Sequence, residues 1–294
     1  MAVSRGIRIR VGGRISRVGI KDILLYAAMI CLVAFTALPL IYVISTAFKP
    51  YDEIMRFPPK FFVERPTLNN FEDLVVALNG TTVPFLRYVF NSLVTTVVTV
   101  ALTVIVSSMG AYALVKQHVP LGKVWFTIIL MALMFPGTVT TIPSYLVVSE
   151  LGLMNSHMAL VIPKIAVAYN LFLMKQFCEQ LPNPLLEAAR IDGANEWTVF
   201  FKIVIPFLKP AWATLIVFSF VASWNDYFSP LVYIQDEALK TLPLALSTIG
   251  ESGNVARAGA MAAATFLTTL PTIVIFTAMQ GQVIATMAHS GIKE

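Results

Sequence analysis

Between Arg87 and Lys116 the chain reads YVFNSLVTTVVTVALTVIVSSMGAYALV, a run without a single acidic or basic residue. At 1.5 Å per residue, a helix of this length would be about 42 Å long. It would therefore exceed the roughly 30 Å of hydrocarbon in a bilayer. In hydrocarbon a helix satisfies its own backbone hydrogen bonds, so the run predicts a membrane-spanning helix.

Other stretches of similar character lie on both sides of this run. Together with it they cover Ile23–Phe48, Tyr88–Val115, Val124–Val148, His157–Met174, Pro210–Ile234 and Ala258–Met287. The composition agrees, because 57% of the 294 residues are hydrophobic and 13% are charged, with a mean hydropathy of +0.77. Soluble domains are about 25% charged. We therefore predict an all-α integral membrane protein with six transmembrane helices and the lipid bilayer as its solvent.

The distribution of charge predicts the orientation of the chain. Several bases and no acid precede Asp22, namely Arg5, Arg8, Arg10, Arg14, Arg17 and Lys21. The positive-inside rule then places the N-terminus in the cytoplasm, and six spans return the C-terminus to the same side. We divide the chain into a basic cytoplasmic N-terminus (1–22), a transmembrane domain (23–287) and a short cytoplasmic tail (288–294). The bases that give a net charge of +5 flank the membrane, so we expect no nucleic-acid partner.

Two loops have patterns of their own. The external loop Lys49–Arg87 carries prolines and balanced charges, which predicts a folded cap. The cytoplasmic segment 175–209 predicts two short helices. Asn183 would be the N-cap of the first, with Pro184 at its first position, and Gly193 would end it. Asn195 would cap the second helix, giving a protrusion on the cytoplasmic face.

The same segment contains a recognisable motif. Glu187-Ala188-Ala189, then Gly193 and Ile203-Val204-Ile205-Pro206, resemble the EAA loop of the permease subunits of ATP-binding-cassette importers. The longer run EAARIDGANEWTVFFKIVIP resembles the carbohydrate, maltose-type branch, as the second permease of a heterodimeric pore. Family-like motifs also stand at Asn91-Ser92-Leu93, Ala111-Tyr112-Ala113-Leu114, Trp224-Asn225-Asp226 and Thr241-Leu242-Pro243-Leu244.

This resemblance implies a transport subunit that works with partners. It implies coupling to a separate ATPase through Glu187, Ala188, Ala189, Asp192 and Gly193. It also implies two ATP-binding subunits that hold ATP and Mg, a second homologous permease and an external solute-binding protein. The phosphate-cradling GxxxxGK[ST] loop is absent from the sequence, so we expect a non-catalytic chain that binds no cofactor itself. The implied location is the cytoplasmic (inner) membrane of a bacterium or archaeon.

Polar groups inside the spans are candidates for the substrate pathway, because an ionisable group in hydrocarbon costs at least about 2.5 kcal/mol. The candidates are Lys164, Asn170, Trp224, Asn225 and Asp226. Amides and aromatic faces suit a sugar. A structural alternative is that Lys164 pairs with an acid of another helix and that Asp226 lies near the external interface.

The expected ligand is a sugar, an oligosaccharide or a polysaccharide fragment. The same architecture could import an anionic saccharide, such as a uronate oligomer, or glycerol phosphate. A less favoured alternative is an intramembrane enzyme, which needs a nucleophile–histidine pair or paired acids deep in the spans. His157 lies at the edge of its span, so we predict no catalytic residue. The scattered histidines and cysteines predict no metal site.

Overall fold

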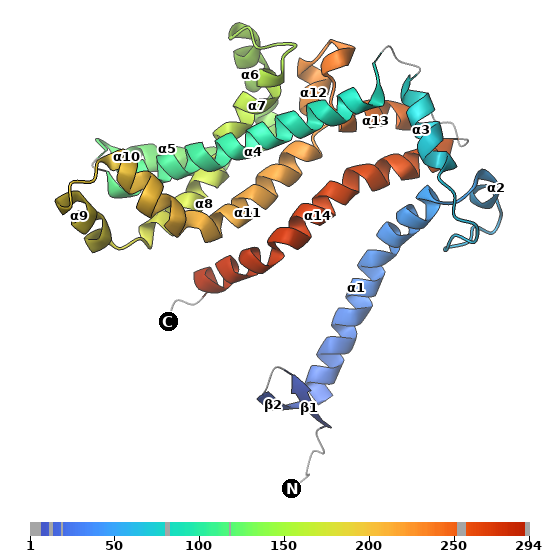
Figure 1. Cartoon of the computed structure of the whole chain (residues 1–294), viewed down its shortest axis with the longest axis horizontal. Helices are drawn as coiled ribbons and strands as arrows, with labels where there is room; N and C mark the ends of the chain where they lie inside the picture. The colour runs from blue at the N-terminus through green and yellow to red at the C-terminus, as the bar shows by residue number, and fades with distance from the viewer. Residues whose placement is uncertain are drawn as a thin grey trace. The chain divides into compact units, whose positions relative to one another are not determined.

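The computed structural model describes residues 7–11, 14–18, 20–79, 83–117, 119–251 and 257–291. They belong to two compact units, residues 1–73 with 255–266 and residues 74–254 with 267–294. Helices make up most of both units (Figure 1). The last three residues of the predicted tail, 292–294, lie outside the described residues.

The first unit is built around α1 (Ile20–Ala47), with the short α2 (Tyr51–Ile54) and the start of α3 (Asn69–Asn79). Inside the predicted basic N-terminus, β1 (Ile7–Val11) and β2 (Arg14–Val18) form an antiparallel hairpin in which Ile7 pairs with Val18. No strand was predicted there, since the segment was interpreted from its charge alone.

The segment after α1 is folded by buried polar groups. The carboxylate of Glu53 is almost fully buried and accepts the backbone N–H groups of Glu64 (3.1 Å) and Arg65 (3.0 Å). The side-chain amide of Asn70 donates to the carbonyls of Ala47 (2.9 Å) and Lys49 (2.7 Å). A carboxylate and an amide side chain thus form the hydrogen bonds that these backbone N–H and carbonyl groups would otherwise make within a regular helix or sheet. The first part of the loop Lys49–Arg87 is therefore ordered, as predicted for a folded cap.

The second unit is organised around α4 (Phe85–Lys116), which packs against several other helices along its length (Figure 1). The other elements are α5 (Gly122–Ala132), α6 (Gly137–Glu150), α7 (His157–Ile165), α8 (Ala168–Glu179), α9 (Asn183–Ile191), α10 (Glu196–Val199), the π-helical turn η1 (Phe200–Val204), α11 (Ile205–Trp224), α12 (Phe228–Tyr233), the 3-10 turn η2 (Glu237–Leu239), α13 (Leu242–Glu251) and most of α14 (Ala258–Gly291).

Most of the buried side chains of α4 are small or carry a hydroxyl group. They include Thr95, Thr96, Thr99, Thr103, Ser107, Ser108 and Ala111. Large apolar residues such as Leu93, Val97 and Ile105 lie on the exposed face. Small residues let helices approach closely in a membrane, where apolar surface gains little from being buried against protein instead of lipid. This distribution is typical of a helix with protein on one side and lipid on the other.

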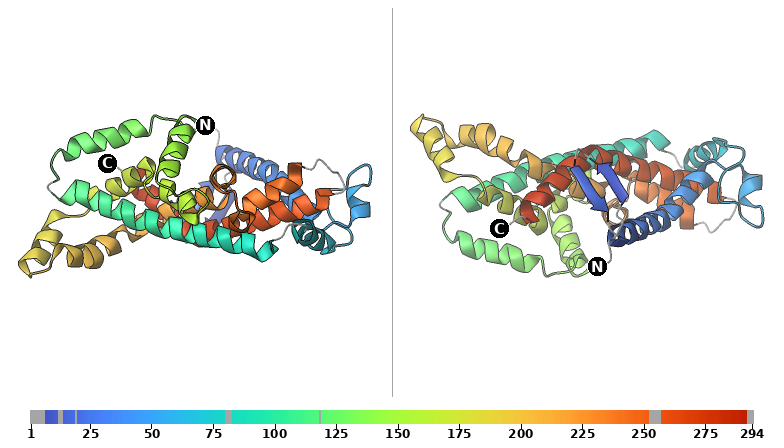
Figure 2. Two further views of the ribbon diagram at one scale, coloured as in Figure 1. Left: turned by 90° about the horizontal axis from the view of Figure 1, so that it is seen from above. Right: turned by 90° about the horizontal axis from the view of Figure 1, so that it is seen from below.

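Within the described residues, four helices are long and apolar enough to cross a membrane, and two bent pairs raise that number to six. The predicted third span, Val124–Val148, is not straight, because α5 and α6 meet at 112°. In the view from above, the two helices lie as separate rods (Figure 2). The bend falls at Pro136, which stands in extended backbone before α6 and disfavours helical conformation in the residue before it. The fourth predicted span is α7 and α8, bent by 44° after Pro163.

The predicted fifth span, Pro210–Ile234, has different boundaries in the structure. Helical backbone is continuous from Glu196 to Trp224 and is broken after Trp224, before α12 begins at Phe228. The widened turn η1 lies directly before Pro206 in the chain. A proline has no N–H for the carbonyl four residues earlier, so the hydrogen-bond ladder must be rearranged at this point.

Candidate functional site

The loop that carries the EAA motif is α9 followed by α10, and its turn has the geometry of a Schellman cap. Gly193 has φ +83°. Its N–H donates to the carbonyl of Arg190 (3.0 Å), and the N–H of Ala194 donates to the carbonyl of Ala189 (3.0 Å). These two bonds satisfy carbonyls that the end of a helix leaves open. Because the left-handed region is cheap only for glycine, residue 193 determines where α9 ends.

The start of α9 differs from the prediction. Pro182 occupies the N-cap position and Asn183 is the first helical residue, so Asn183 is not the cap. Its side-chain oxygen instead accepts a hydrogen bond from the ammonium group of Lys116 (2.8 Å), which also donates to the carbonyl of Leu181 (2.6 Å). The predicted cap of α10 is confirmed, since the side chain of Asn195 accepts the N–H of Thr198 (2.7 Å).

A polar cluster joins α4 to the second part of this loop. Glu196 accepts hydrogen bonds from the hydroxyl of Tyr112 (2.6 Å), the amide of Gln117 (2.5 Å) and the guanidinium of Arg190 (2.8 Å). The hydrogen bond to Glu196 raises the pKa of Arg190, which as an arginine is already a cation at every physiological pH. With Lys116 holding the start of α9, the end of α4 contacts both ends of the loop.

The motif residues lie on the outer surface of α9. Glu187, Ala188, Asp192 and Gly193 are exposed, and Ala189 is partly buried against the core below. Leu186 is buried and anchors the helix. Two apolar neighbours are nevertheless left outside, Leu185 at 50% and Ile191 at 86% exposure. Exposed apolar side chains beside a rigid turn are typical of a surface that meets another protein.

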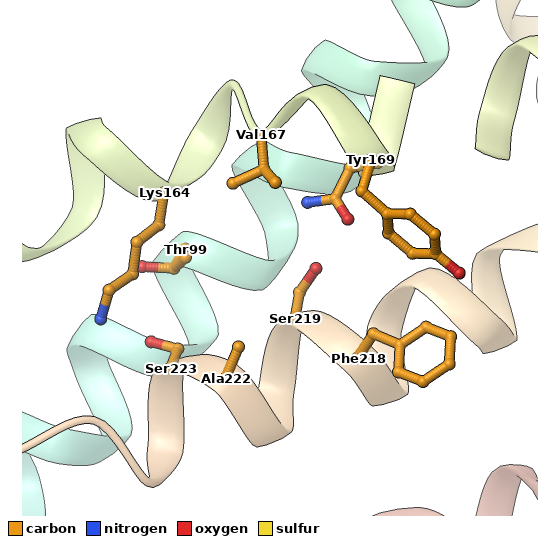
Figure 3. A pocket seen from close by; sticks show the side chains of 9 residues that line it. Thr99, Lys164, Val167, Tyr169, Phe218, Ser219, Ala222 and Ser223 are labelled. Atoms are coloured by element: carbon orange, nitrogen blue, oxygen red, sulfur yellow. The ribbon is translucent and has the colours of Figure 1, made fainter. Parts of the chain in front are cut away.

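A cavity of about 340 Å³ lies between α4, α7, α8 and α11 (Figure 3). Five of the lining residues are polar and four are apolar or aromatic: Thr99, Lys164, Asn170, Ser219, Ser223, and Val167, Tyr169, Phe218, Ala222. Figure 3 shows Lys164 at one end and the rings of Tyr169 and Phe218 at the other. These two rings meet edge to face, with centroids 6.0 Å apart.

The charge of Lys164 is matched by Asp226. The ammonium nitrogen and Oδ2 are 2.5 Å apart, and the two side chains are 22% and 15% exposed. The other oxygen, Oδ1, accepts the N–H groups of Phe228 (3.0 Å) and Ser229 (3.1 Å) at the start of α12. The structural alternative for Lys164 is therefore present in the structure, because this lysine pairs with an acid of the segment that joins α11 to α12.

Trp224 and Asn225 do not line this cavity. The indole N–H of Trp224 donates to the carbonyl of Thr268 (2.9 Å) on α14, and its ring stacks on Phe220. The amide of Asn225 donates to the carbonyl of Val221 (3.0 Å) and to the hydroxyl of Thr272 (3.4 Å). Of the five candidate pathway residues, the structure brings Lys164 and Asn170 into the cavity, while Asp226 forms the ion pair with Lys164.

Seven of the nine lining residues were not singled out from the sequence, among them Thr99 and Ser219, which carry buried hydroxyls. Thr99 and Ser219 are 2% and 7% exposed, and neither hydroxyl oxygen has a hydrogen-bond partner in the part of the chain that the structure describes. Thr99 belongs to a helical series with Thr95 and Thr103, and this spacing was the signal available in the sequence. Within the described residues, no group of three or more His, Cys, Asp or Glu side chains could hold a metal ion.

The sequence matches one family model over most of its length. The family is described as "Binding-protein-dependent transport system inner membrane component", and the match covers residues 103–288.

Curated relatives carry transport names. The lactose transport system permease protein LacG of Rhizobium radiobacter is 35% identical over 68% of this chain and 73% of its own length. The sn-glycerol-3-phosphate transport system permease protein UgpE of Pectobacterium atrosepticum is 36% identical over 69% of this chain and 72% of its own. The arabinooligosaccharides transport system permease protein AraQ of Halalkalibacterium halodurans is 30% identical over 89% and 93%.

The fold also matches a solved structure. A chain of a bacterial ABC transporter involved in the import of the acidic polysaccharide alginate superposes with a TM-score of 0.78. The two chains are 23% identical, and the match covers 89% of this chain and 96% of the other. At this identity the match shows the fold.

Proposed function

Since the chain belongs to the family of binding-protein-dependent transport system inner-membrane components, we propose that it forms one half of the translocation pathway of an ATP-binding-cassette importer. It is a multi-pass inner-membrane protein and a non-catalytic transport subunit. The pathway carries a sugar, an oligosaccharide or a polysaccharide fragment. Both termini lie in the cytoplasm, in keeping with the basic N-terminal segment.

The observation that carries this proposal is the build of α9. The helix is short, is closed by the Schellman turn at Gly193, and is anchored by Leu186. It presents Leu185, Ala188 and Ile191 at three-residue spacing on its exposed surface. A helix with outward apolar anchors is the form that docks into a groove of a partner. We assign that groove to an ATP-binding subunit, with Glu187 and Asp192 supplying charge at the rim and Ala188, Ala189 and Gly193 allowing close approach.

The remaining partners follow from the same architecture. Two ATP-binding subunits hold ATP and Mg, a second homologous permease completes the pore, and an external solute-binding protein delivers the ligand. This chain holds no cofactor of its own. Alternating access in such a pore requires that work done on α9 reach the ligand cavity.

We propose α4 as the route for that work. Its cytoplasmic end is fixed to the EAA loop through Lys116 and through Tyr112 on Glu196. Its middle contributes Thr99 to the cavity and donates from Thr103 to the carbonyl of Lys164 (3.4 Å). A movement of α9 is thereby linked to the wall of the cavity through one continuous helix.

The substrate pathway is proposed to run through the cavity between α4, α7, α8 and α11. Lys164 and Asn170 line it, and Asp226 keeps Lys164 in place. Trp224 and Asn225 support the pathway by fixing α11 to α14. The relatives named for lactose and for glycerol 3-phosphate keep both a neutral and an anionic ligand open at this level.

The proposal is tested by assembly and coupling. The chain is expressed with the ATP-binding subunit, the second permease and the solute-binding protein of its source organism, and the membrane complex is purified through a tag on this chain. We expect the ATPase to co-purify and its hydrolysis to rise when the loaded binding protein is added. A chain that reaches the membrane, moves solute and recruits no ATPase would instead be a channel or a self-powered carrier.

A further inference from the structure

We propose that the cavity between α4, α7, α8 and α11 takes an uncharged, hydroxyl-rich ligand, a neutral saccharide, and discriminates against anionic ones. This inference rests on the proposed function and specifies the ligand of the same pathway. It depends on three features of the cavity wall: its net charge, its unpartnered hydroxyls and its aromatic end.

The positive charge on the cavity wall is neutralised by an acidic residue of the same chain. Among the nine lining residues Lys164 alone carries a charge, and its ammonium group lies 2.5 Å from Oδ2 of Asp226. A carboxylate ligand would have to draw Lys164 away and leave Asp226 with an uncompensated charge in a largely buried place. Breaking one partner out of a buried pair is strongly unfavourable, whereas an intact pair offers little to a further charge.

The hydroxyls of the wall are available to a ligand. Serine and threonine in a helix commonly donate to the carbonyl four residues earlier. On α4, Thr95 and Ser108 do so, at 2.8 and 2.6 Å. Thr99 and Ser219 do not, although both are more than nine-tenths buried and both line the cavity. A hydroxyl both donates and accepts, so sugar hydroxyls can satisfy both groups without any charge.

The far end of the wall suits the apolar face of a sugar ring. Tyr169 comes from α8 and Phe218 from α11, and Figure 3 shows their rings together at the end away from Lys164. Figure 3 also shows the hydroxyl of Ser219 between Lys164 and these rings. Apolar walls with a few placed polar groups are typical of small-molecule sites. A pyranose or furanose offers both surfaces, C–H on its faces and hydroxyls on its rim.

The test measures binding to the purified full complex without the solute-binding protein. Saturation-transfer NMR titrations give the Kd for maltotriose, arabinotriose and lactose as neutral probes and for trigalacturonate as the anionic probe. We expect at least one neutral probe to bind more tightly than trigalacturonate. Thr99→Val and Ser219→Ala should each weaken neutral binding about fivefold, the value of one hydrogen bond of about 1 kcal/mol.

A matched control is available on α11. Thr214 is likewise buried and without a hydrogen-bond partner in the described part of the chain, but it does not line the cavity. Thr214→Val should leave the Kd values unchanged. If it weakens neutral binding as much as Thr99→Val does, the effect is one of folding and the assignment of Thr99 and Ser219 is overturned.

The charge is tested by Asp226→Asn, which keeps Oδ1 to accept the N–H groups of Phe228 and Ser229 but releases Lys164. Trigalacturonate binding should then improve about fivefold, since a freed, partly exposed charge contributes about 1 kcal/mol. Adding Lys164→Met should abolish that gain.

Three results would overturn the inference. The first is that the wild-type complex binds trigalacturonate more tightly than every neutral probe. The others are that Asp226→Asn does not bind trigalacturonate more tightly than the wild type, or that a complex that still couples ATP hydrolysis binds no neutral probe. Failure of the proposed function is a separate result, because it would appear as loss of the ATPase subunit from the complex whichever probe is used.

Discussion

Replacing Gly193 by valine tests the EAA loop at a point where the cost can be worked from the structure. Gly193 has φ +83°, and a Cβ built there would meet no atom within 4 Å. The penalty is therefore confined to the backbone and amounts to about 1–2 kcal/mol for a side-chain-bearing residue in the left-handed region. That energy shifts the equilibrium away from the Schellman turn by about 5- to 30-fold.

The assay must separate coupling from assembly. Gly193 lies outside the apolar spans, so Gly193→Val should reach the membrane and assemble with the ATPase. It should then show weakened ligand-stimulated ATP hydrolysis and uptake in proteoliposomes. Gly193→Asn should be affected less, because asparagine tolerates left-handed backbone better than valine does.

Gly152 supplies the matched control. It also has a positive φ (+65°), and its Cβ would meet no atom within 4 Å, but it lies between α6 and α7. Gly152→Val carries the same kind of strain and should leave coupling intact. Full coupling in Gly193→Val, or equal uncoupling in Gly152→Val, would refute the assignment of this turn to force transmission.

Further substitutions test other parts of the proposal. Glu187→Lys should preserve membrane insertion and reduce coupled uptake, because it reverses a charge on the exposed docking surface; unchanged uptake would argue against that surface. Glu196→Gln should loosen the α4–loop cluster by about 0.5–1 kcal/mol, seen as faster hydrogen exchange around α10; unchanged exchange would show that the cluster does not hold the loop. In intact cells, an impermeant maleimide should label Glu64→Cys and not Gly193→Cys; the reverse pattern would invert the topology. Trp224→Phe should lower the Tm of the complex, since it removes a hydrogen bond between α11 and α14 that contributes about 1 kcal/mol; an unchanged Tm would show that this hydrogen bond contributes little.

Local sequence signals predicted the EAA loop well and failed where a distant residue intervenes. Gly193 and Asn195 act through backbone groups within a few residues, so turn and cap could be recognised from the sequence. Asn183 has the residue type of a cap, but Lys116, 67 positions away, takes its side chain. Pro182 then takes the cap position, a result that no local pattern could indicate.

Hydropathy located the spans and gave no information on the angles at which their helical segments meet. Val124–Val148 is continuous in hydropathy, yet its two halves meet at 112°. Pro136 marked the position of the break, but packing against other helices sets the angle. In the fourth span, α7 continues past Pro163 to Ile165 and the 44° break falls at residues 166 and 167, so a proline in the sequence does not by itself locate the break.

In the candidate cavity, too, the sequence identified some of the residues, and the structure added how they pair. The cost of charge in hydrocarbon singled out Lys164 and Asp226 from the sequence, and the structure adds that they neutralise each other across 62 positions. Their pairing changes the interpretation of the site, because a lysine that suggested an anionic ligand becomes part of a neutral wall. Thr99 and Ser219 were missed because hydroxyl side chains are common in membrane helices, and only the combination of a place on the cavity wall with the absence of a hydrogen-bond partner in the described residues distinguishes these two.

The opposite end of α4, which we propose as the transmitting element, is also fixed by hydrogen bonds. The amide of Asn91 donates to the carbonyls of Ala238 (2.8 Å) and Lys240 (2.9 Å), and the hydroxyl of Ser92 accepts the N–H of Leu242 (2.7 Å). Family-like motifs at Asn91-Ser92 and Thr241–Leu244 are thus two sides of one contact. The spans built from α5–α6 and α7–α8 are broken, so a displacement entering them can be absorbed at a bend. In α4 the described backbone is helical from Phe85 to Lys116, with the EAA loop bonded to one end, the η2–α13 segment to the other, and Thr99 on the cavity between them. A displacement of the loop must therefore move the cavity wall and the η2–α13 segment together or break one of these contacts.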